Sequence, residues 1–321
     1  KAFQYFQKAS EAGDESAMFN LADCYFNGLG TEQSEEQAVP WYQKAAEANI
    51  SIAQYMLGTC YHFGKGVSPN EELALHWLRK AAEQDYVGAQ YALGTLLFRN
   101  EDSGENDAEA VRWLERAAEL GDIGSQVKLG VCYQDGYNVL EQGKVCFKED
   151  MEKAVFHLKR AADAGNSYAQ YQLGKIYLEE DTRNIPAAIQ YLTLAAKQKN
   201  EFAAYRLGKL YLTGEELPKN TELALHYLKM AADAGNQYAQ YALGNVYLIG
   251  KDVQQDKELA YDYFLKSAEQ GNIYAAYFLE HWNDMPHPDL LLMATRLMRH
   301  LEHIIEENVA GRKSGGRRQG I

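Results

Sequence analysis

Hydrophobic and polar positions follow two helical patterns in this chain, and both patterns recur at a period of 36 residues over much of its length. The first pattern, Ala-Gln-Tyr-x-Leu-Gly, occupies residues 53–58, 89–94, 169–174 and 239–244. The second pattern, Ala-x-x-Trp-x-x-Lys-Ala-Ala, occupies residues 38–46 and 74–82 and returns later with Tyr in place of Trp. In both patterns the apolar residues have the spacing of one helix face. Each period therefore predicts two helices joined by a turn, and the fixed period predicts a solenoid of stacked units.

The ends of these helices can also be predicted. A residue that favours the N-cap stands four positions before the leading Ala of every second helix: Ser34, Asn70, Asn106, Asp150, Asn184, Asn220 and Asp256. Glycines such as Gly28 and Gly64 are placed to end the first helices in a left-handed conformation. A glycine inside a helix costs about 1 kcal/mol against Ala, so the glycine that closes the first pattern indicates close helix packing.

This periodicity predicts a repeat array over residues 1–285. Residues 1–13 are expected to form an orphan second helix and residues 272–285 a degenerate first helix. Full repeats are predicted at 14–49, 50–85, 86–121, 122–165, 166–199, 200–235 and 236–271. The fourth repeat carries an insertion at 138–147, which we interpret as a tolerated surface loop; the alternative is that it decorates a binding face.

The end of the chain differs from the array. After Pro286 and Pro288 a helix is predicted to residue 310, with an apolar seam at Leu290, Ala294, Leu297, Leu301 and Ile304. This helix either caps the last repeat or forms a dimer seam. We favour the cap, and hence a monomer, because the seam is short and a solenoid needs capping. Residues 311–321 contain basic but no acidic residues and are expected to form a disordered tail.

The two patterns together resemble the Sel-one-like repeat, a relative of the tetratricopeptide repeat. The resemblance covers residues 1 to about 285. It implies an all-α, right-handed α/α superhelical solenoid that works as a protein–protein interaction scaffold or adaptor. It also implies no catalytic residues and no cofactor.

A second resemblance concerns residues 294–301, Ala-Thr-Arg-Leu-Met-Arg-His-Leu, and the Gly/Arg-rich tail after them. Together with the repeats, they look like the C-terminal regions of some bacterial mobilisation relaxases. This alternative would make the array an accessory region of a DNA-transfer enzyme whose nuclease lies outside this chain. Because the chain starts at Lys1 inside a predicted helix and lacks an initiator Met, we expect it to be a fragment.

Composition narrows the classes of partner. The net charge of −13 disfavours binding of nucleic acid or anionic membranes by the array. If the chain binds nucleic acid, we expect only the basic tail to do so. No apolar run reaches the roughly 18 residues of a membrane span. Cys24, Cys60 and Cys132 share one apolar repeat position and are expected to be buried and reduced, which suits a cytoplasmic protein. Cys146, in the insertion, is expected to be the reactive thiol.

The sequence lacks the usual catalytic motifs: there is no Gly-rich phosphate loop and no nucleophile elbow. His300, His303 and Glu306 could together hold a metal ion. We interpret them as a polar helix face because a metal site needs three or four converging ligands. His157 takes the position of Trp77 and is predicted to pack. His76 and His226 are predicted to be solvated. We therefore predict no enzyme activity, no metal and no cofactor.

A candidate binding surface follows from repeat positions three, seven and ten of the first helices, which share one stripe and are expected to line the concave face. Early repeats present Ser16, Asn20, Asp23, Ile52, Met56 and Thr59. Later repeats present aromatic and basic residues instead: Tyr168, Gln172, Lys175, Phe202, Arg206, Lys209, Tyr238, Asn245 and Tyr274. Aromatic side chains and Arg are common interface anchors, and the cations would suit an acidic or carboxylate-bearing segment. The alternative is that these aromatics pack against the preceding repeat as core.

Overall fold

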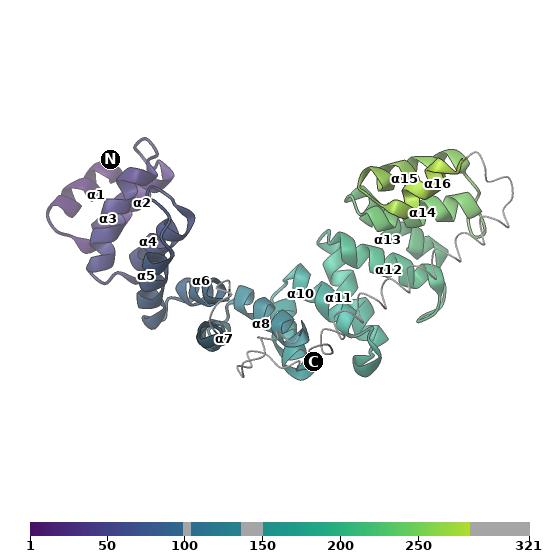
Figure 1. Cartoon of the computed structure of the whole chain (residues 1–321), viewed down its shortest axis with the longest axis horizontal. Coiled ribbons are helices and arrows are strands. Elements are labelled where there is room, and N and C mark those ends of the chain that lie inside the picture. The colour runs from purple at the N-terminus through teal and green to yellow at the C-terminus, as the bar shows by residue number, and fades with distance from the viewer. Residues whose placement is uncertain (99–103, 136–149, 283–321) are drawn as a thin grey trace, which may run out of the picture. The chain divides into compact units, whose positions relative to one another are not determined.

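The computed structural model describes residues 1–98, 104–135 and 150–282. Of these residues 76% are helical, and no strand occurs among them. The chain divides into two compact units, Lys1–Gly165 and Asn166–Ile321, referred to below as the N-terminal and C-terminal units. The prediction of an all-α solenoid is confirmed, since in each unit every helix packs against the next one along the chain (Figure 1).

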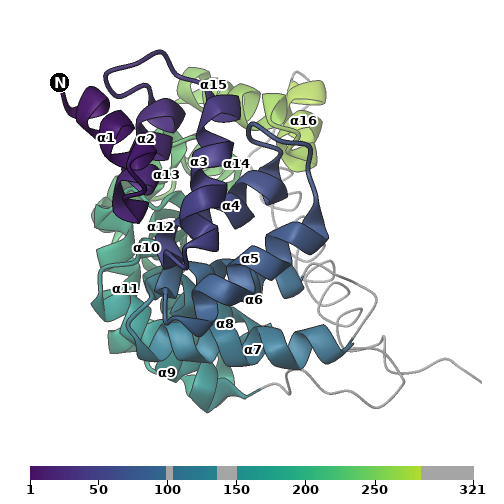
Figure 2. The ribbon, with the colours of Figure 1, turned by 90° about the vertical axis from the view of Figure 1, so that its left-hand side faces the viewer.

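The N-terminal unit stacks its helices in sequence order, so that pairs within a repeat alternate with contacts between repeats (Figure 2). Its helices are α1 (Ala2–Glu11), α2 (Glu15–Asn27), α3 (Glu35–Glu47), α4 (Ser51–Phe63), α5 (Glu71–Glu83), α6 (Val87–Leu97), α7 (Gly104–Glu119), α8 (Ile123–Asp135) and α9 (Met151–Asp163).

The C-terminal unit has the same organisation. Its elements are α10 (Ser167–Ile176), the 3-10 turn η1 (Glu180–Thr182), α11 (Ile185–Lys197), α12 (Glu201–Thr213), α13 (Thr221–Asp233), α14 (Gln237–Ile249), α15 (Lys257–Glu269) and α16 (Ile273–Glu280). The first helix α12 also contacts the first helices of both neighbouring repeats, α10 and α14. The first helices α10, α12 and α14 therefore form a continuous layer.

The recurring glycine has the packing role that its position predicted. A Cβ built on Gly58 of α4 would lie 2.8 Å from Cγ of Leu78 on α5. At Gly208 of α12 the corresponding distance, to Cγ of Leu228 on α13, is 2.6 Å. The same relation holds at Gly94, Gly130, Gly174 and Gly244. The two helices of a repeat thus cross so closely that a methyl group at this position would overlap the partner side chain.

Most of the predicted helix ends are confirmed. Side-chain N-caps occur at Ser34, Asn70, Asp150, Asn184, Asn220 and Asp256, each accepting a backbone N–H three residues later. Gly28 and Gly64 end α2 and α4 with φ near +70°. The N-cap prediction for Asn106 is wrong, because α7 begins at Gly104 and takes Asn106 into its first turn. A cap residue marks a helix start only where the preceding residues do not join the helix.

Buried glutamines of the first pattern join successive repeats. Gln54 donates its side-chain N–H to the carbonyl of Ala46 at 3.1 Å, and Gln90 donates to that of Ala82 at 3.2 Å. Gln126 and Gln240 make the same bond to Ala118 and Ala232. Each acceptor is a carbonyl in the last turn of the preceding second helix, which also accepts the backbone N–H three residues later, so the glutamine uses its second acceptor site. This glutamine seam was not predicted from the sequence, although the signature Gln marks it.

The predictions for individual Cys and His residues can be checked where the structure describes them. Cys24, Cys60 and Cys132 are buried and unbridged, as predicted. His157 is half-buried and stacks on Tyr133 with ring centroids 5.8 Å apart, whereas His76 and His226 are exposed. Cys146, the insertion 138–147, the helix predicted at 286–310 with His300, His303 and Glu306, and the tail 311–321 lie outside the described residues. The repeat boundaries stay a prediction.

Candidate protein-interaction surface

The predicted surface residues of the C-terminal unit lie on its first helices, α10, α12, α14 and α16. We call the set the aromatic–cation stripe: Tyr168, Gln172, Lys175, Phe202, Arg206, Lys209, Tyr238, Asn245 and Tyr274. Three aromatic side chains at the same repeat position are nearly half exposed, with 45% at Tyr168, 48% at Phe202 and 46% at Tyr238. Large exposed rings at one repeat position form a regular row along the layer of first helices.

Each of the later rings also contacts the preceding repeat. Phe202 lies against Tyr171, with centroids 6.0 Å apart, and Tyr238 lies against Tyr205 at the same distance. Tyr274, which is half-buried, lies 6.1 Å from Tyr241. One side of each ring therefore packs and holds it in place, while Phe202 and Tyr238 keep much of their surface free. A ring held in this way loses little entropy on contact with a partner.

The basic residues of the stripe differ in exposure. Arg206 and Lys209, one turn apart on α12, are both exposed. Lys175 on α10 is half-buried; its Nζ lies 3.3 Å from Oε1 of Gln172 and 5.8 Å from the ring centroid of Tyr171. The cations of α12 are thus the more accessible ones.

Two stripe residues are positioned as supports. Gln172 is only 8% exposed and accepts a hydrogen bond from Lys175, so it orients that cation from below. Asn245 is half-buried and donates from Nδ2 to the carbonyl of Tyr241 at 3.2 Å, within its own helix. Helical spacing placed both residues on the stripe, but it gave no measure of how deep they lie.

The charge on these helices contrasts with that of the whole chain. Helices α10, α12 and α14 contain Lys175, Arg206 and Lys209 but a single acidic residue, Glu201. The chain as a whole has a net charge of −13. A local excess of cations on an acidic protein attracts anionic groups to this layer of helices.

The corresponding stripe of the N-terminal unit has a different character. Ser16 is exposed, and Asn20 donates to the carbonyl of Ser16 at 2.8 Å. Ile52, Met56 and Thr59 on α4 are half-buried. Asp23 is half-buried as well, and neither α2 nor α4 contains Lys or Arg. This stripe therefore offers a mainly uncharged surface.

Other kinds of site were sought in the same residues. Where the chain is described, no three His, Cys, Asp or Glu side chains gather so as to hold a metal ion. None of the described helices is long and apolar enough to cross a membrane.

Comparison with protein families identifies the repeats. The family model described as "Sel1 repeat" matches residues 1–14, 15–50, 51–86, 87–122, 123–166, 167–200, 202–236 and 237–272. The chain belongs to the Sel1 repeat family. Sel1 arrays generally act as protein–protein interaction scaffolds rather than as enzymes. No curated protein matches the chain.

Two solved structures are similar to this Sel1 array. One is c5321, a protective antigen of uropathogenic Escherichia coli with an SLR fold; it is 28% identical with a TM-score of 0.80. The match covers 89% of this chain but 60% of the E. coli protein, so the array spans less than two thirds of that relative. The other is a Sel1 repeat protein from Oxalobacter formigenes, which is 28% identical with a TM-score of 0.69. This match covers 87% of the present chain and 79% of the Oxalobacter chain.

Proposed function

We propose that this Sel1 array is a non-enzymatic scaffold that holds a segment of a partner protein on the aromatic–cation stripe of its C-terminal unit. The observation that carries the proposal is the row of half-exposed rings at Tyr168, Phe202 and Tyr238 beside the exposed cations Arg206 and Lys209. Aromatic residues and Arg account for much of the binding energy at protein interfaces.

The chemistry of the stripe specifies the partner segment. Arg206 offers a planar guanidinium that pairs with a carboxylate through two parallel hydrogen bonds, and Lys209 adds a second charge one turn away. The rings of Phe202 and Tyr238 offer apolar contact area next to these charges. The segment that fits is an acidic or C-terminal carboxylate-bearing peptide with apolar side chains between its charges. The layer formed by α10, α12 and α14 is continuous enough to receive it in extended form.

The test uses short synthetic peptides that combine Glu with Leu or Phe, and matched peptides with Lys in place of Glu. We expect the acidic set to bind at least about tenfold more tightly, as measured by fluorescence anisotropy, because a charge-assisted hydrogen bond contributes roughly 1.5–3 kcal/mol. Arg206→Glu and Lys209→Glu should each abolish that preference. The matched control is Lys197→Glu, an exposed lysine on the second helix α11, which should bind like the natural chain.

Stability must be measured beside binding, because the rings also pack. Phe202→Ala should weaken binding while the melting temperature stays close to that of the natural chain. If Phe202→Ala lowers the melting temperature strongly, the ring is part of the core and the aromatic half of the proposal fails. If Lys197→Glu weakens binding as much as Arg206→Glu, the stripe is not the binding surface. The relaxase alternative gains no support from the relatives above. Its residues, 294–321, lie outside the described part of the chain.

A further inference from the structure

The last repeat exposes apolar side chains at positions that face the next repeat elsewhere in the C-terminal unit. Tyr277 on α16 is the equivalent of Tyr241 on α14, yet it is 42% exposed whereas Tyr241 is 9% exposed. The ring of Tyr274, from the following repeat, lies on Tyr241 at 6.1 Å. Tyr277 instead stacks on His281 at the end of its own helix. Among the described residues, therefore, none covers the surface that a further repeat would cover.

Helix α15 contributes to the same surface. Leu265 is the equivalent of Lys229, whose Nζ reaches over the ring of Tyr247 in the following repeat at 5.8 Å. The position is polar in all earlier repeats, with Thr193 and Lys159 before Lys229, and it becomes apolar at Leu265, which is 40% exposed. Leu265 therefore adds to a contiguous exposed apolar patch, and such patches mark interaction surfaces.

Together these side chains define an end face, made of Tyr261, Leu265, Ile273 and Tyr277. Tyr261 and Leu265 are one turn apart on α15, and Ile273 and Tyr277 are one turn apart on α16, so each pair lies on one side of its helix. Ile273 is 69% exposed, and its equivalents on α10, α12 and α14 are Ser167, Glu201 and Gln237. Polar residues are thus replaced by apolar ones on both of the last two described helices, at Leu265 on α15 and at Ile273 on α16.

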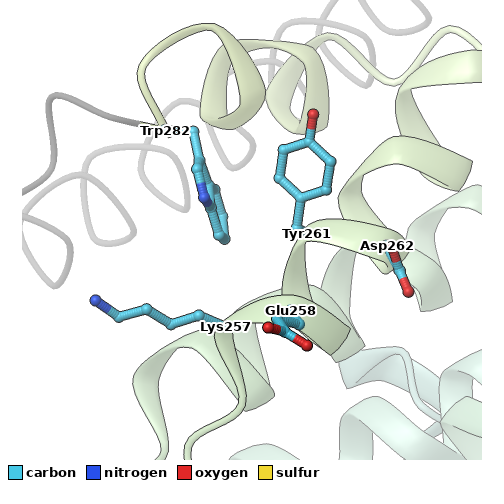
Figure 3. A pocket seen from close by; sticks show the side chains of 5 residues that line it. All are labelled: Lys257, Glu258, Tyr261, Asp262 and Trp282. Carbon is cyan, nitrogen blue, oxygen red and sulfur yellow. The ribbon is translucent and has the colours of Figure 1, made fainter.

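The end of the described chain lies on this face. Trp282 meets Tyr261 edge to face at 5.2 Å and lies 6.2 Å from Phe264. Around these rings is an open pocket of about 280 Å³ lined by Lys257, Glu258, Tyr261, Asp262 and Trp282. Figure 3 shows the rings of Trp282 and Tyr261 next to each other, with Lys257 and Glu258 below them. The residues that follow Trp282 therefore start at the end face.

We propose that the end face is covered by the chain's own residues 289–305. Their apolar stripe, Leu290, Ala294, Leu297, Leu301 and Ile304, has the spacing of one helix side. The six residues between Trp282 and Asp289 span up to about 20 Å when extended, which is enough to bring a helix of about 25 Å back across α15 and α16. The covering segment belongs to the same molecule, so this proposal does not depend on the partner of the aromatic–cation stripe.

Cysteine cross-linking in the full chain tests this placement. In a Cys146→Ser background, Leu265→Cys is combined in turn with Leu290→Cys, Leu297→Cys and Leu301→Cys and oxidised mildly. A disulfide requires Cα atoms within about 7 Å, so at least one pair should cross-link within a single chain and be found by peptide mass mapping. The matched control is Leu265→Cys with Thr295→Cys, which lies on the opposite side of the segment and should not cross-link.

Two outcomes overturn the proposal. A disulfide that joins two chains assigns the end face to a second copy, and the absence of any cross-link from the stripe positions removes the segment from it. Hydrogen exchange provides a second measurement in the same full chain. Leu297→Glu with Leu301→Glu should speed exchange in α15 and α16 about tenfold, whereas Thr295→Glu with His303→Glu should leave it nearly unchanged. Equal exchange in both variants also contradicts the proposal.

Discussion

Replacing Gly208 by Ala tests how closely the two helices of a repeat approach. The new Cβ would lie 2.6 Å from Cγ and 2.8 Å from Cδ2 of Leu228, and 3.1 Å from the Leu228 backbone N. Ala gains about 1 kcal/mol of helix propensity over Gly. Overpacking of this kind costs about 1–3 kcal/mol. The cost should lie near the upper end because the backbone N has no rotamer by which to move away. We therefore expect a net destabilisation of about 1–2 kcal/mol, opposite in sign to the helix propensity.

The assay is urea denaturation followed by far-ultraviolet circular dichroism, with a double-mutant cycle. Leu228→Ala alone should cost about 2–5 kcal/mol because it empties a fully buried position. In the double variant the new methyl group occupies part of that space, so its cost should fall short of the sum by about 1–3 kcal/mol. The first repeat gives the reciprocal control: Ala22 holds the glycine position there beside Tyr42, and Ala22→Gly should destabilise. A Gly208→Ala variant as stable as the natural chain, or a strictly additive cycle, would refute the close-packing argument.

Three further predictions follow from single residues. Burial lowers the pKa of His157 from its ordinary value of 6.5 to about 4. Between about pH 6.5 and 4, the His157 side chain is therefore protonated in the unfolded chain and neutral in the folded chain. The free energy of unfolding should therefore fall by at most about 3 kcal/mol as the pH drops through that window. Tyr191 is the equivalent residue in the next repeat, so His157→Tyr supplies a ring that this position accepts. The variant should remove this part of the pH dependence when the free energy of unfolding is measured by denaturation at the two ends of the window. Lys199 has φ of +64° at a turn where other repeats carry Gly235 and Gly271, so Lys199→Gly should raise stability by roughly 1 kcal/mol in thermal denaturation. Asn49→Gly should not, because Asn49 accepts hydrogen bonds from Gln54 and Gln84. Burial raises the pKa of the Cys24 thiol, and it raises the pKa of the Cys60 thiol to about 11. Thiol reagents should therefore label Cys146 first, and Cys24, Cys60 and Cys132 only after unfolding; rapid labelling of all four in the native chain would contradict this.

Repetition explains how much of the fold could be predicted from the sequence. Each helix end is sampled in several repeats, so the cap at Asn70 is supported by those at Ser34 and Asn220. The N-cap prediction for Asn106 failed because Gly104 and Glu105 join α7 ahead of it. Local patterns are reliable where the repeats agree and weak where one of them departs.

The candidate site was less predictable because periodicity describes direction around a helix and not depth. The spacing of Tyr168, Gln172 and Lys175 places them on one side of α10, yet Tyr168 is 45% exposed and Gln172 only 8%. The difference in exposure between Tyr168 and Gln172 depends on how closely the neighbouring helices approach each side chain. The distance between helices cannot be obtained from the spacing of residues in a single sequence. The role of the signature Gln was missed for a similar reason, since its acceptor belongs to the preceding repeat.

Because the glutamine seam uses the same donor and acceptor positions in successive repeats, a whole repeat can be removed or added and the hydrogen bond between the new neighbours is kept. The donor of Gln90 and the acceptor of Ala82 stand at the same places in their repeats as Gln54 and Ala46. Excision of residues 47–82 would join Ala46 directly to residue 83 and present the Ala46 carbonyl to Gln90. Duplication of the same stretch would add one more identical bond. Array length can therefore change by whole repeats during evolution, because each new junction forms the same hydrogen bond. The surface residues of each repeat take no part in this bond and are free to diverge.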